Sequence, residues 1–402
     1  MVIRRFYTVI ILCILALPIS VPGNCADQKL WDMKLLSKAP AAVFGEKVGL
    51  VQTVVYEGEP FGGKPTHVFA YYAAPSGTGP FPGMVLVHGG GGTAFSDWAK
   101  HWAERGYAAI AMDLSGNGPQ GRLPDGGPDQ SDTTKFRAFG DNEAKEMWTY
   151  HAVAAVIRAH SLLESRPEVD KNRIGLTGIS WGGYLTSIIA GVDHRFKVAV
   201  PVYGCGFLHE DSYWKEPILD KMPMEQRDRW VKYFDPSQYI GGTKCPILFL
   251  NGTNDFAYTL ESYRKGYDLV HAPKTLSVQL RLPHGHIWTF GIVDAFVDNI
   301  LTGKPAIERL GTTRVKGSTV EATLTTSTVP TKAELYYTSE SGKWQERKWL
   351  NIPAKVEGKR VVAELPAAKP TAYYLAVTDV AGNIVTSRPV IVKVERVNSS
   401  KH

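Results

Sequence analysis

The spacing of hydrophobic residues from about residue 49 to residue 301 predicts strands that alternate with helices. The short apolar run Gly83–Val87 is typical of a strand covered on both faces, whereas Glu143–Leu163 carries apolar residues at helical spacing. Such alternation predicts an α/β fold, a doubly wound and mostly parallel sheet with helices on both faces. The predicted strands are Val51–Tyr56, Val68–Ala73, Gly83–Val87, Tyr107–Met112, Arg173–Thr177, Val198–Tyr203, Pro246–Leu250 and Leu276–Leu282. The predicted helices are Asp97–Arg105, Glu143–Leu163, one from Trp181, Leu260–Val270 and Trp288–Leu301.

Two segments depart from this alternation. Residues 207–240 are rich in aromatic side chains and are expected to form an insertion over the site. Beyond Lys304-Pro305 the chain changes to short runs of alternating polar and apolar residues, bounded by Gly, Pro, Asn and Ser, which predict a small C-terminal β-sandwich over residues 305–397. The predicted strands there are Val320–Leu324, Ala333–Thr338, Arg360–Leu365, Ala372–Thr378 and Val390–Val394.

The N-terminal residues predict export. Arg4 and Arg5 precede a stretch that is apolar from Phe6 to Ile19 except for Thr8 and Pro18. This pattern is typical of a secretory signal peptide, here residues 1–26, which leaves residues 27–304 for the α/β part and predicts a secreted or periplasmic protein. A membrane span needs about 20 apolar residues, and no other stretch approaches that length, so no stable membrane insertion is expected.

Composition narrows the possible classes. The 402 residues are 44% hydrophobic and 21% charged, which excludes a disordered chain. The net charge is +6 without a basic run, so no nucleic-acid partner is expected. Cys205 follows one predicted strand and Cys245 precedes the next, which places them at opposite ends of a parallel sheet and predicts two free thiols. No partner protein or oligomeric state follows from the sequence.

The most specific motif is Gly178-Ile179-Ser180-Trp181-Gly182. It follows the predicted strand Arg173–Thr177 and begins a helix, which is the context of a nucleophile elbow. Glycines two positions either side of the serine fit a sharp turn in which neighbouring backbone comes close. Because a serine hydroxyl needs a neighbouring base to attack, the motif predicts a nucleophilic Ser180 together with a histidine and an acid later in the chain.

Candidates for these partners follow later predicted strands. Asp255 comes just after Pro246–Leu250, and Glu210 and Asp211 are the alternative acids after the preceding strand. His286 follows a glycine and precedes the next predicted helix, so we expect it to be the base; His284, two residues earlier, is the alternative and would otherwise support the loop. The predicted catalytic set is therefore Ser180, Asp255 and His286.

A glycine run supplies candidate hydrogen-bond donors. His88-Gly89-Gly90-Gly91-Gly92 follows the strand Gly83–Val87, and backbone N–H groups of glycines can approach a developing oxyanion closely. We expect the N–H of Trp181 and that of Gly89 or Gly90 to form an oxyanion hole, with His88 anchoring the loop. The histidines do not form a metal motif, and no metal or other cofactor is expected.

Three tryptophans are candidates for substrate contacts. Trp214 and Trp230 lie in the aromatic insertion, and Trp288 follows the predicted base. The alternative for each is packing in the core, which is the more common use of an indole.

These motifs together resemble the α/β-hydrolase superfamily, in its dienelactone hydrolase-like and acetyl xylan esterase-like branch. The points of match are His88-Gly-Gly-Gly, Gly178-Ile-Ser-Trp-Gly-Gly, Asp255 and Gly285-His286. Ser180 stands where dienelactone hydrolases proper have cysteine, which argues against their lactone chemistry. The turn Asp379–Asn383 resembles one in fibronectin type III-like and immunoglobulin-like modules. The resemblance implies a secreted esterase acting on acylated carbohydrates or small esters.

Two other functions remain open from the sequence. A prolyl-oligopeptidase-like serine peptidase shares these motifs, but the segment before the α/β part is expected to be too short for the propeller of such peptidases. A non-catalytic binding protein on a hydrolase scaffold is the third possibility, and the presence of all the expected catalytic residue types argues against it.

Overall fold

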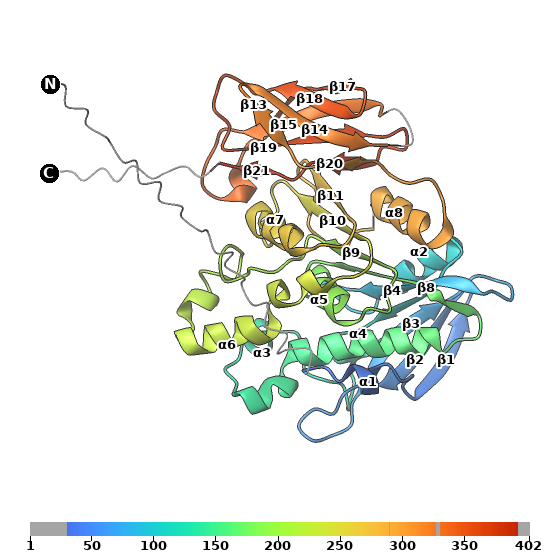
Figure 1. The fold of residues 1–402 in the computed structure, drawn as a ribbon. Helices are drawn as coiled ribbons and strands as arrows, with labels where there is room; N and C mark the ends of the chain where they lie inside the picture. The colour runs from blue at the N-terminus through green and yellow to red at the C-terminus, as the bar shows by residue number, and fades with distance from the viewer. Residues whose placement is uncertain (1–29, 289, 327–329, 393–402) are drawn as a thin grey trace, which may run out of the picture.

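The computed structural model describes residues 30–288, 290–326 and 330–392. The predicted signal peptide, residues 1–26, lies outside the described residues. The chain forms a large mixed sheet with helices on both faces, and antiparallel β-sheets from the C-terminal third stand at one edge of it (Figure 1). This arrangement confirms the predicted α/β class with an additional C-terminal β region.

The large sheet has nine strands in the order β1-β2-β3-β5-β4-β8-β9-β10-β11. Neighbours pair antiparallel from β1 to β5 and parallel from β5 to β11. The first edge strand was not predicted, because most of its residues are exposed and it has no buried apolar run. The bounds are β1 Ala42–Val48, β2 Val51–Glu57, β3 His67–Ala73, β4 Phe81–Val87, β5 Ala108–Met112, β8 Val169–Ile179, β9 Val198–Val202, β10 Ile247–Gly252 and β11 Lys274–Gln279.

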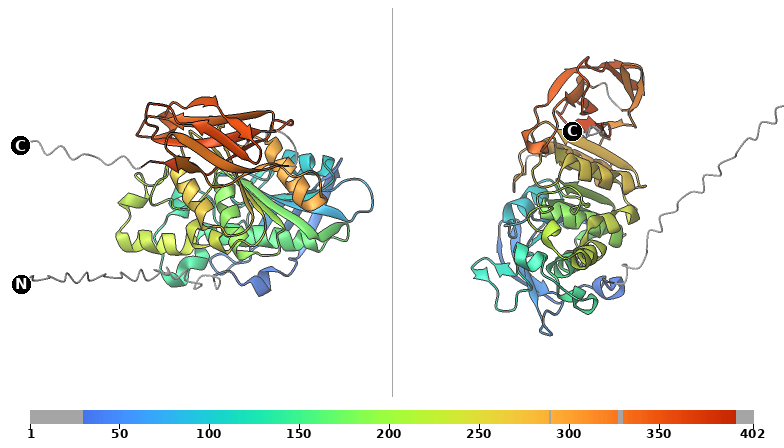
Figure 2. Two further views of the ribbon diagram at one scale, coloured as in Figure 1. Left: turned by 45° about the horizontal axis from the view of Figure 1, so that its top comes forward. Right: turned by 90° about the vertical axis from the view of Figure 1, so that its left-hand side faces the viewer.

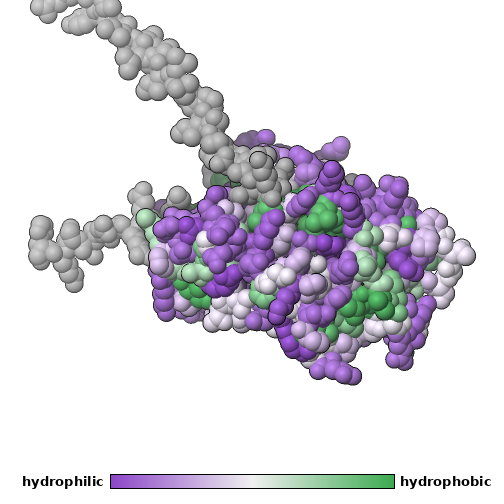
Figure 3. Space-filling model, turned by 90° about the horizontal axis from the view of Figure 1, so that it is seen from below, coloured by the Kyte–Doolittle hydropathy of each residue, from purple (hydrophilic) through white to green (hydrophobic). Residues whose placement is uncertain are grey.

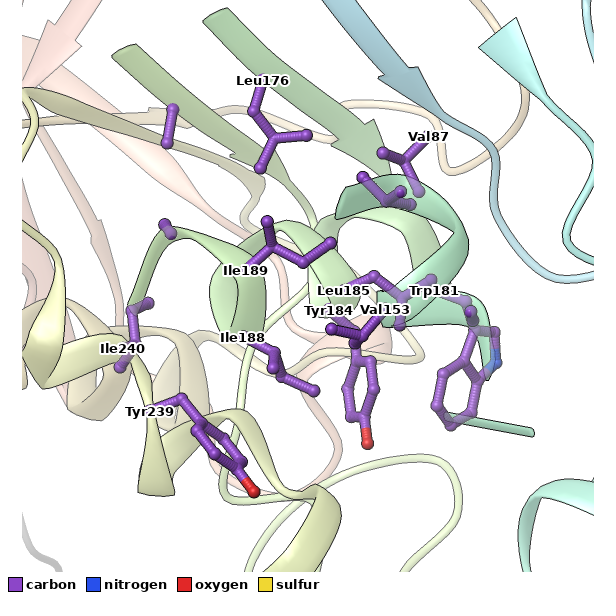
Figure 4. Close-up of a cluster of buried hydrophobic side chains, with 14 of the residues drawn as sticks. Val87, Val153, Leu176, Trp181, Tyr184, Leu185, Ile188, Ile189, Tyr239 and Ile240 are labelled. Atoms are coloured by element: carbon purple, nitrogen blue, oxygen red, sulfur yellow. The ribbon is translucent and has the colours of Figure 1, made fainter. Parts of the chain in front are cut away.

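The period-two alternation of the strands divides the core between the two faces of this sheet. Within β4, Val85 and Val87 join the cluster under helices α4 and α5, whereas Met84 and Leu86 join the cluster under α2 and α8. Figure 4 shows the first cluster, where side chains of α5 pack beneath the strands. The helices are α1 Met33–Leu36, α2 Ser96–Glu104, α3 Asp132–Lys135, α4 Trp148–Glu164, α5 Trp181–Val192, α6 Met224–Phe234, α7 Leu260–Leu269 and α8 Gly291–Thr302.

Short 3₁₀ turns account for the main errors in the predicted helix bounds. The helix expected from Glu143 begins at Trp148, because Asp141–Glu146 forms a separate 3₁₀ turn and Met147 is extended. The Glu143 carboxylate caps this turn by accepting from the N–H of Gly140 at 2.7 Å. The other 3₁₀ turns are Leu219–Lys221, Pro236–Gln238, Ile240–Gly242 and Trp344–Glu346 (η6).

The C-terminal β region consists of two antiparallel sheets. One has the order β12-β14-β18-β17 with β13 paired to β14, and the other has the order β16-β15-β19-β20 with β21 paired to β19. Figure 2 shows this region stacked on one end of the large sheet. Its strands are β12 Arg309–Leu310, β13 Arg314–Lys316, β14 Thr319–Thr325, β15 Lys332–Thr338, β16 Leu350–Pro353, β17 Lys355–Glu357, β18 Arg360–Glu364, β19 Ala372–Thr378, β20 Ile384–Thr386 and β21 Val390–Ile391; a small hairpin, β6 Asn117–Gly118 with β7 Gly121–Arg122, lies outside both.

The C-terminal β region contacts the edge strand β11. Thr386 in β20 accepts from the N–H of Val278 at 3.2 Å, and Arg388 forms an ion pair with Asp268 at the end of α7. Apolar side chains of the region, Leu375 and Val377 among them, belong to the same buried cluster as helix α8. The two parts therefore share a continuous core.

The surface and the two cysteines of the described residues have the following features. On the face opposite the C-terminal β region hydrophilic residues predominate, with separate hydrophobic areas between them (Figure 3). Among the described residues, no helix has the length and hydropathy needed to cross a bilayer. Cys205 and Cys245 are both buried and free, which confirms that prediction.

Candidate active site

The turn between β8 and α5 presents Ser180. Its backbone has φ 58° and ψ −120°, a strained conformation that L-residues rarely adopt. A Cβ on Gly178 would overlap the carbonyl of Gly182, and one on Gly182 would overlap the carbonyl of Val87. Both glycines of the motif are therefore required by the close packing of the turn, as expected for a nucleophile elbow.

Ser180, His284 and Asp255 form a continuous chain of hydrogen bonds. The Ser180 hydroxyl lies 2.8 Å from Nε2 of His284 and donates to it when the imidazole is neutral. On the other side of the ring, Nδ1 of His284 donates to Oδ2 of Asp255 at 2.7 Å. This geometry joins a hydroxyl, an imidazole and a carboxylate that are far apart in the chain.

The prediction that His286 is the partner of Ser180 is wrong. Its Nε2 instead accepts from the N–H of Gly89 at 3.1 Å, and its ring packs 5.1 Å from that of Phe95. The reason lies in the length of β11, which ends at Gln279 rather than at the predicted Leu282. Arg281 then turns the chain with φ 50°, so that His284 and not His286 reaches the serine.

Asp255 is held by its own loop. Its side chain is 1% exposed, and Oδ1 accepts from the N–H groups of Ala257 at 2.9 Å and Tyr258 at 2.7 Å. The two bonds to Oδ1 thus fix the orientation of the carboxylate, and Oδ2 accepts from His284. A buried carboxylate with all these donors is an effective orienter of an imidazole.

The alternative acids are engaged elsewhere. Asp211 accepts from the Thr259 hydroxyl at 2.7 Å, and Glu210 forms an ion pair with Lys265. The geometry therefore selects Asp255, the predicted acid, as the carboxylate that contacts the histidine.

Aromatic side chains fix the orientation of His284. Its ring lies 4.4 Å from that of Tyr203 and 5.0 Å from that of Phe256, measured between centroids. The Tyr203 hydroxyl donates to the carbonyl of Gly285 at 2.6 Å. Burial raises the pKa of Tyr203 well above its usual value, so the phenol stays protonated and this bond to the histidine loop persists.

The glycine loop after β4 is held by two histidines. His88 donates from Nδ1 to the carbonyl of Gly89 at 2.7 Å and accepts on Nε2 from the N–H of Leu114 at 2.9 Å. His286 accepts from the N–H of the same Gly89. Burial lowers the pKa of both His88 and His286, which keeps each imidazole neutral and able to accept.

Gly89 and Gly90, the two glycines predicted as alternative oxyanion-hole donors, differ in whether their N–H groups are free within the described part of the chain. The N–H of Gly89 is occupied by His286, whereas Gly90 lines the cavity that contains Ser180. Among the described residues, no hydrogen-bond acceptor is found for the N–H of Gly90 or of Trp181. These two amides remain as donors for an oxyanion.

The cavity at Ser180 is open and about 1070 Å³ in size, including its mouth. Tyr213 and Phe256 are 54% and 47% exposed at this site, and their rings are in edge contact at 5.9 Å. Lys135 is buried in the wall, with Nζ 2.9 Å from Asp132 and 4.3 Å from the ring centroid of Trp181. The lining residues are Gly90, Gly91, Gln130, Ser131, Asp132, Lys135, Ser180, Trp181, Tyr213, Trp214, Phe256, Ala257 and His284.

The three candidate tryptophans have different positions. Trp214 lines the cavity and packs 4.6 Å from Trp181. Trp230 does not, because it is buried and donates from Nε1 to the carbonyl of Lys135 at 3.0 Å. Trp288 packs on Trp98 at 5.4 Å, away from the cavity lining. The geometry thus supports only Trp214 as a substrate contact.

Sequence reasoning missed Lys135 and Phe256 as cavity residues, and it did not single out Tyr213 within the aromatic insertion expected over the site. Phe256 directly follows Asp255 and Tyr213 lies in the aromatic insertion, so their positions in the sequence could have indicated that they line the cavity. Lys135 carried none, because a lone lysine in a polar segment is usually solvated; here burial lowers its pKa while Asp132 favours its charged form. No group of three or more His, Cys, Asp or Glu side chains suited to a metal ion is found in the described ranges.

A family model and several known proteins match this chain. The model described as acetyl xylan esterase (AXE1) matches residues 37–239, which include Ser180 but end before Asp255 and His284. Acetyl esterase Axe7A of Xylanibacter ruminicola is 22% identical over 236 residues, 55% of this chain and 53% of that protein. The chain therefore spans about half the length of this curated relative.

Solved structures show the same fold. Acetyl xylan esterase from Paenibacillus sp. R4 aligns with a TM-score of 0.57 at 24% identity, over 68% of this chain and 94% of its own. Acetyl xylan esterase 1 from Thermoanaerobacterium sp. JW/SL YS485 aligns with a TM-score of 0.52 at 19% identity, over 68% of this chain and 92% of its own. These alignments identify the large sheet and its helices as an α/β-hydrolase fold. Since the family model spans half of its length, the chain belongs to the acetyl xylan esterase (AXE1) family.

Proposed function

We propose that this protein hydrolyses carboxylic esters, with Ser180 as nucleophile, His284 as general base and Asp255 as the residue that orients the imidazole. The observation that carries the proposal is the hydrogen-bonded chain from Ser180 through His284 to Asp255 at an open cavity. Family membership supports the same reaction class.

The geometry fits an acyl-enzyme mechanism. Ser180 attacks the ester carbonyl while its proton passes to Nε2 of His284. The Asp255 carboxylate stabilises the imidazolium and holds the tautomer that has its proton on Nδ1. His284 then protonates the leaving alcohol as the tetrahedral intermediate collapses. Water attacks the acyl-enzyme in the second half, with His284 again accepting the proton.

The developing oxyanion would be stabilised by the N–H groups of Trp181 and Gly90. Trp181 N–H begins helix α5, so the positive end of the helix dipole also faces the site. Removing one oxyanion donor in another serine hydrolase lowers turnover by about 10²–10³. Backbone donors on two rigid segments need no reorganisation as charge develops.

We assign acetylated carbohydrate as the substrate class. The family and its named relatives act on acetyl esters, and Tyr213 and Phe256 offer exposed rings on which a sugar face can stack. Gln130 and Asp132 supply polar groups for hydroxyls in the same cavity. The N-terminal signal pattern is consistent with an exported enzyme that meets polymeric carbohydrate outside the cytoplasm.

A substrate panel with the variant Ser180→Ala tests this proposal. Wild-type protein should hydrolyse 4-nitrophenyl acetate and release acetate from acetylated xylan, and Ser180→Ala should lower both rates by at least about 10⁴-fold. Aminoacyl-proline amides, which a peptidase would cleave, should be poor substrates. A fluorophosphonate probe should label Ser180, as peptide mapping can verify. Unlabelled Ser180 in folded protein, or an unchanged rate in the variant, would contradict the assignment.

A further inference from the structure

Asn254, the residue before Asp255, contacts the C-terminal β region. Its Nδ2 lies 3.1 Å from the carbonyl oxygen of Trp344, 3.3 Å from that of Gln345 and 2.8 Å from that of Arg347, and it donates to this group of acceptors. The three carbonyls belong to η6 and the residue that follows it, between β15 and β16. A single side chain thus joins the loop of the proposed catalytic acid to a different part of the molecule.

The carbonyls that accept from Asn254 belong to a well-packed turn. Trp344 and Trp349 are buried and lie 6.5 Å apart, and Trp349 packs 5.5 Å from Tyr374 in β19. The Arg347 guanidinium lies over the Trp344 ring at 3.5 Å. The turn therefore has its position set by the core of the C-terminal β region and offers Asn254 a rigid partner.

The other end of the Asn254 amide connects to the histidine loop. Its Oδ1 accepts from the Thr253 hydroxyl at 2.6 Å, and that hydroxyl oxygen accepts from the N–H of Arg281 at 3.0 Å. Arg281 is the residue whose positive φ turns the chain toward His284. One network thus holds the acid loop and the histidine loop against the same turn of the C-terminal β region.

Local bonds alone do not set the position of this loop. The backbone N–H groups that hold the Asp255 carboxylate come from Ala257 and Tyr258 in the same loop, so they fix its shape and move with it. Asn251 ties the far end of the loop to β10 by donating to the carbonyl of Tyr258 at 3.0 Å. At the near end, the N–H of Thr253 donates to the carbonyl of Gln279 in β11 at 2.9 Å, and Asn254 adds the link to the C-terminal β region, at the exposed side where Phe256 lies.

We propose that the C-terminal β region is a working part of the hydrolytic site, with Asn254 as a positioning residue that holds Asp255 and, through Thr253 and Arg281, the loop of His284. The inference rests on the proposed function. Catalysis by a Ser-His-Asp set depends on its alignment, and a shift of about 1 Å can lower the rate about 10²-fold. The region thereby acts on the reaction without contacting the substrate.

Kinetics of Asn254→Ala test the proposal. We expect kcat for 4-nitrophenyl acetate to fall about 10- to 100-fold with KM within about twofold, because the substrate cavity does not include Asn254. The control is Arg388→Ala, which removes the ion pair to Asp268 on the same interface and should leave kcat within about twofold.

A double-mutant cycle separates positioning from general destabilisation. If Asn254 acts by positioning Asp255 and the loop of His284, both effects pass through the His284 imidazole, so adding Asn254→Ala to His284→Ala should lower the residual kcat by less than about twofold. An equal fall in both backgrounds, or an unchanged kcat in folded Asn254→Ala, would overturn the proposal. Should Asn254→Ala not fold, Thr253→Val removes the hydroxyl between Arg281 and Asn254 and should lower kcat selectively as well; an unchanged kcat would again overturn it. Wild-type protein without esterase activity would instead contradict the proposed function itself.

Discussion

His284 and His286 are two residues apart and have different partners. His284 contacts Ser180 and Asp255, whereas His286 accepts from the N–H of Gly89. Under the proposed mechanism, His284 would move the proton and His286 would hold the loop that presents the Gly90 amide, so their contributions to kcat should differ.

The variants His284→Ala and His286→Ala measure this difference. We expect the first to lower kcat by at least about 10⁴-fold, because Ser180 loses its base. The second should lower kcat about 10- to 100-fold, because the glycine loop loses an anchor while the base stays in place. Steady-state hydrolysis of 4-nitrophenyl acetate distinguishes the two. If His286→Ala is the more damaging variant, the assignment of the base is wrong.

Single residues also set the pH dependence of stability. His151 is buried in α4 and packs 5.3 Å from Phe61, and burial lowers its pKa to about 4. Because the unfolded chain would take up this proton near pH 6.5, the folded state loses stability as the pH falls from about 6.5 to 4, by about 3 kcal/mol in total from this group. Above pH 6.5 both states are neutral there, and the contribution is constant.

His151→Phe should remove this contribution. The stability loss between pH 7 and pH 4, measured by urea unfolding at each pH, should be about 3 kcal/mol smaller in the variant than in the wild type. His271→Gln, at an exposed position, is the matched control and should keep the wild-type loss. An identical pH dependence in His151→Phe and wild type would show that this imidazole does not titrate as its burial implies.

At the scale of elements, two helical glycines illustrate how local packing decides whether a substitution by alanine raises or lowers the free energy of unfolding. A Cβ on Gly266 in α7 would lie 3.8 Å from Cys205, an ordinary contact, whereas one on Gly191 in α5 would overlap the carbonyl of Tyr239. Gly266→Ala should therefore raise the free energy of unfolding by about 0.5–1 kcal/mol through helix propensity. Gly191→Ala should lower it. Urea unfolding of both variants checks the signs, and a loss of stability in Gly266→Ala would contradict the packing argument.

The regular elements of the α/β part were predictable because their apolar runs match their burial. The predicted strand Gly83–Val87 lies wholly within β4, and most of that strand is buried. The exposed edge strand β1 gave no such signal, since pairing with β2 rather than burial forms it. Strand ends were predicted least well, because a positive φ such as that of Arg281 depends on contacts made elsewhere in the fold.

The same dependence on distant contacts decided which residues of the candidate site could be predicted from the sequence. Ser180 and Asp255 follow from motif and chain order, because Ser180 comes directly after β8 and Asp255 comes three residues after the end of β10. His286 was preferred over His284 because it follows Gly285 and precedes a helix expected from Trp288, but α8 begins only at Gly291, so neither signal reported which ring reaches Ser180. Asn254 could not be singled out, because its acceptors come from a turn about 90 residues later, as the separations of these bonds show.

At the scale of the whole molecule, the C-terminal β region and the α/β part share both polar and apolar contacts. One buried cluster joins Phe296 of α8 to Leu335 of β15, and the other contains Trp344 together with residues of α5. Thr386 bonds to β11 on both sides, accepting from Val278 and donating to the carbonyl of Leu276 at 3.4 Å. Such an interface resembles a core more than a contact between independent modules.

The protein should therefore unfold in one cooperative transition. Thermal unfolding followed by tryptophan fluorescence, by circular dichroism and by loss of esterase activity should give coincident midpoints, and the calorimetric and van't Hoff enthalpies should agree. Asn254→Ala should shift all midpoints together, because the polar link and the shared clusters belong to one folding unit. Two separated calorimetric peaks would show that the C-terminal β region unfolds on its own. In that case, loss of activity at the first peak would show only that hydrolysis depends on the part that unfolds first, whereas full activity after the C-terminal β region has unfolded would contradict its role in the site.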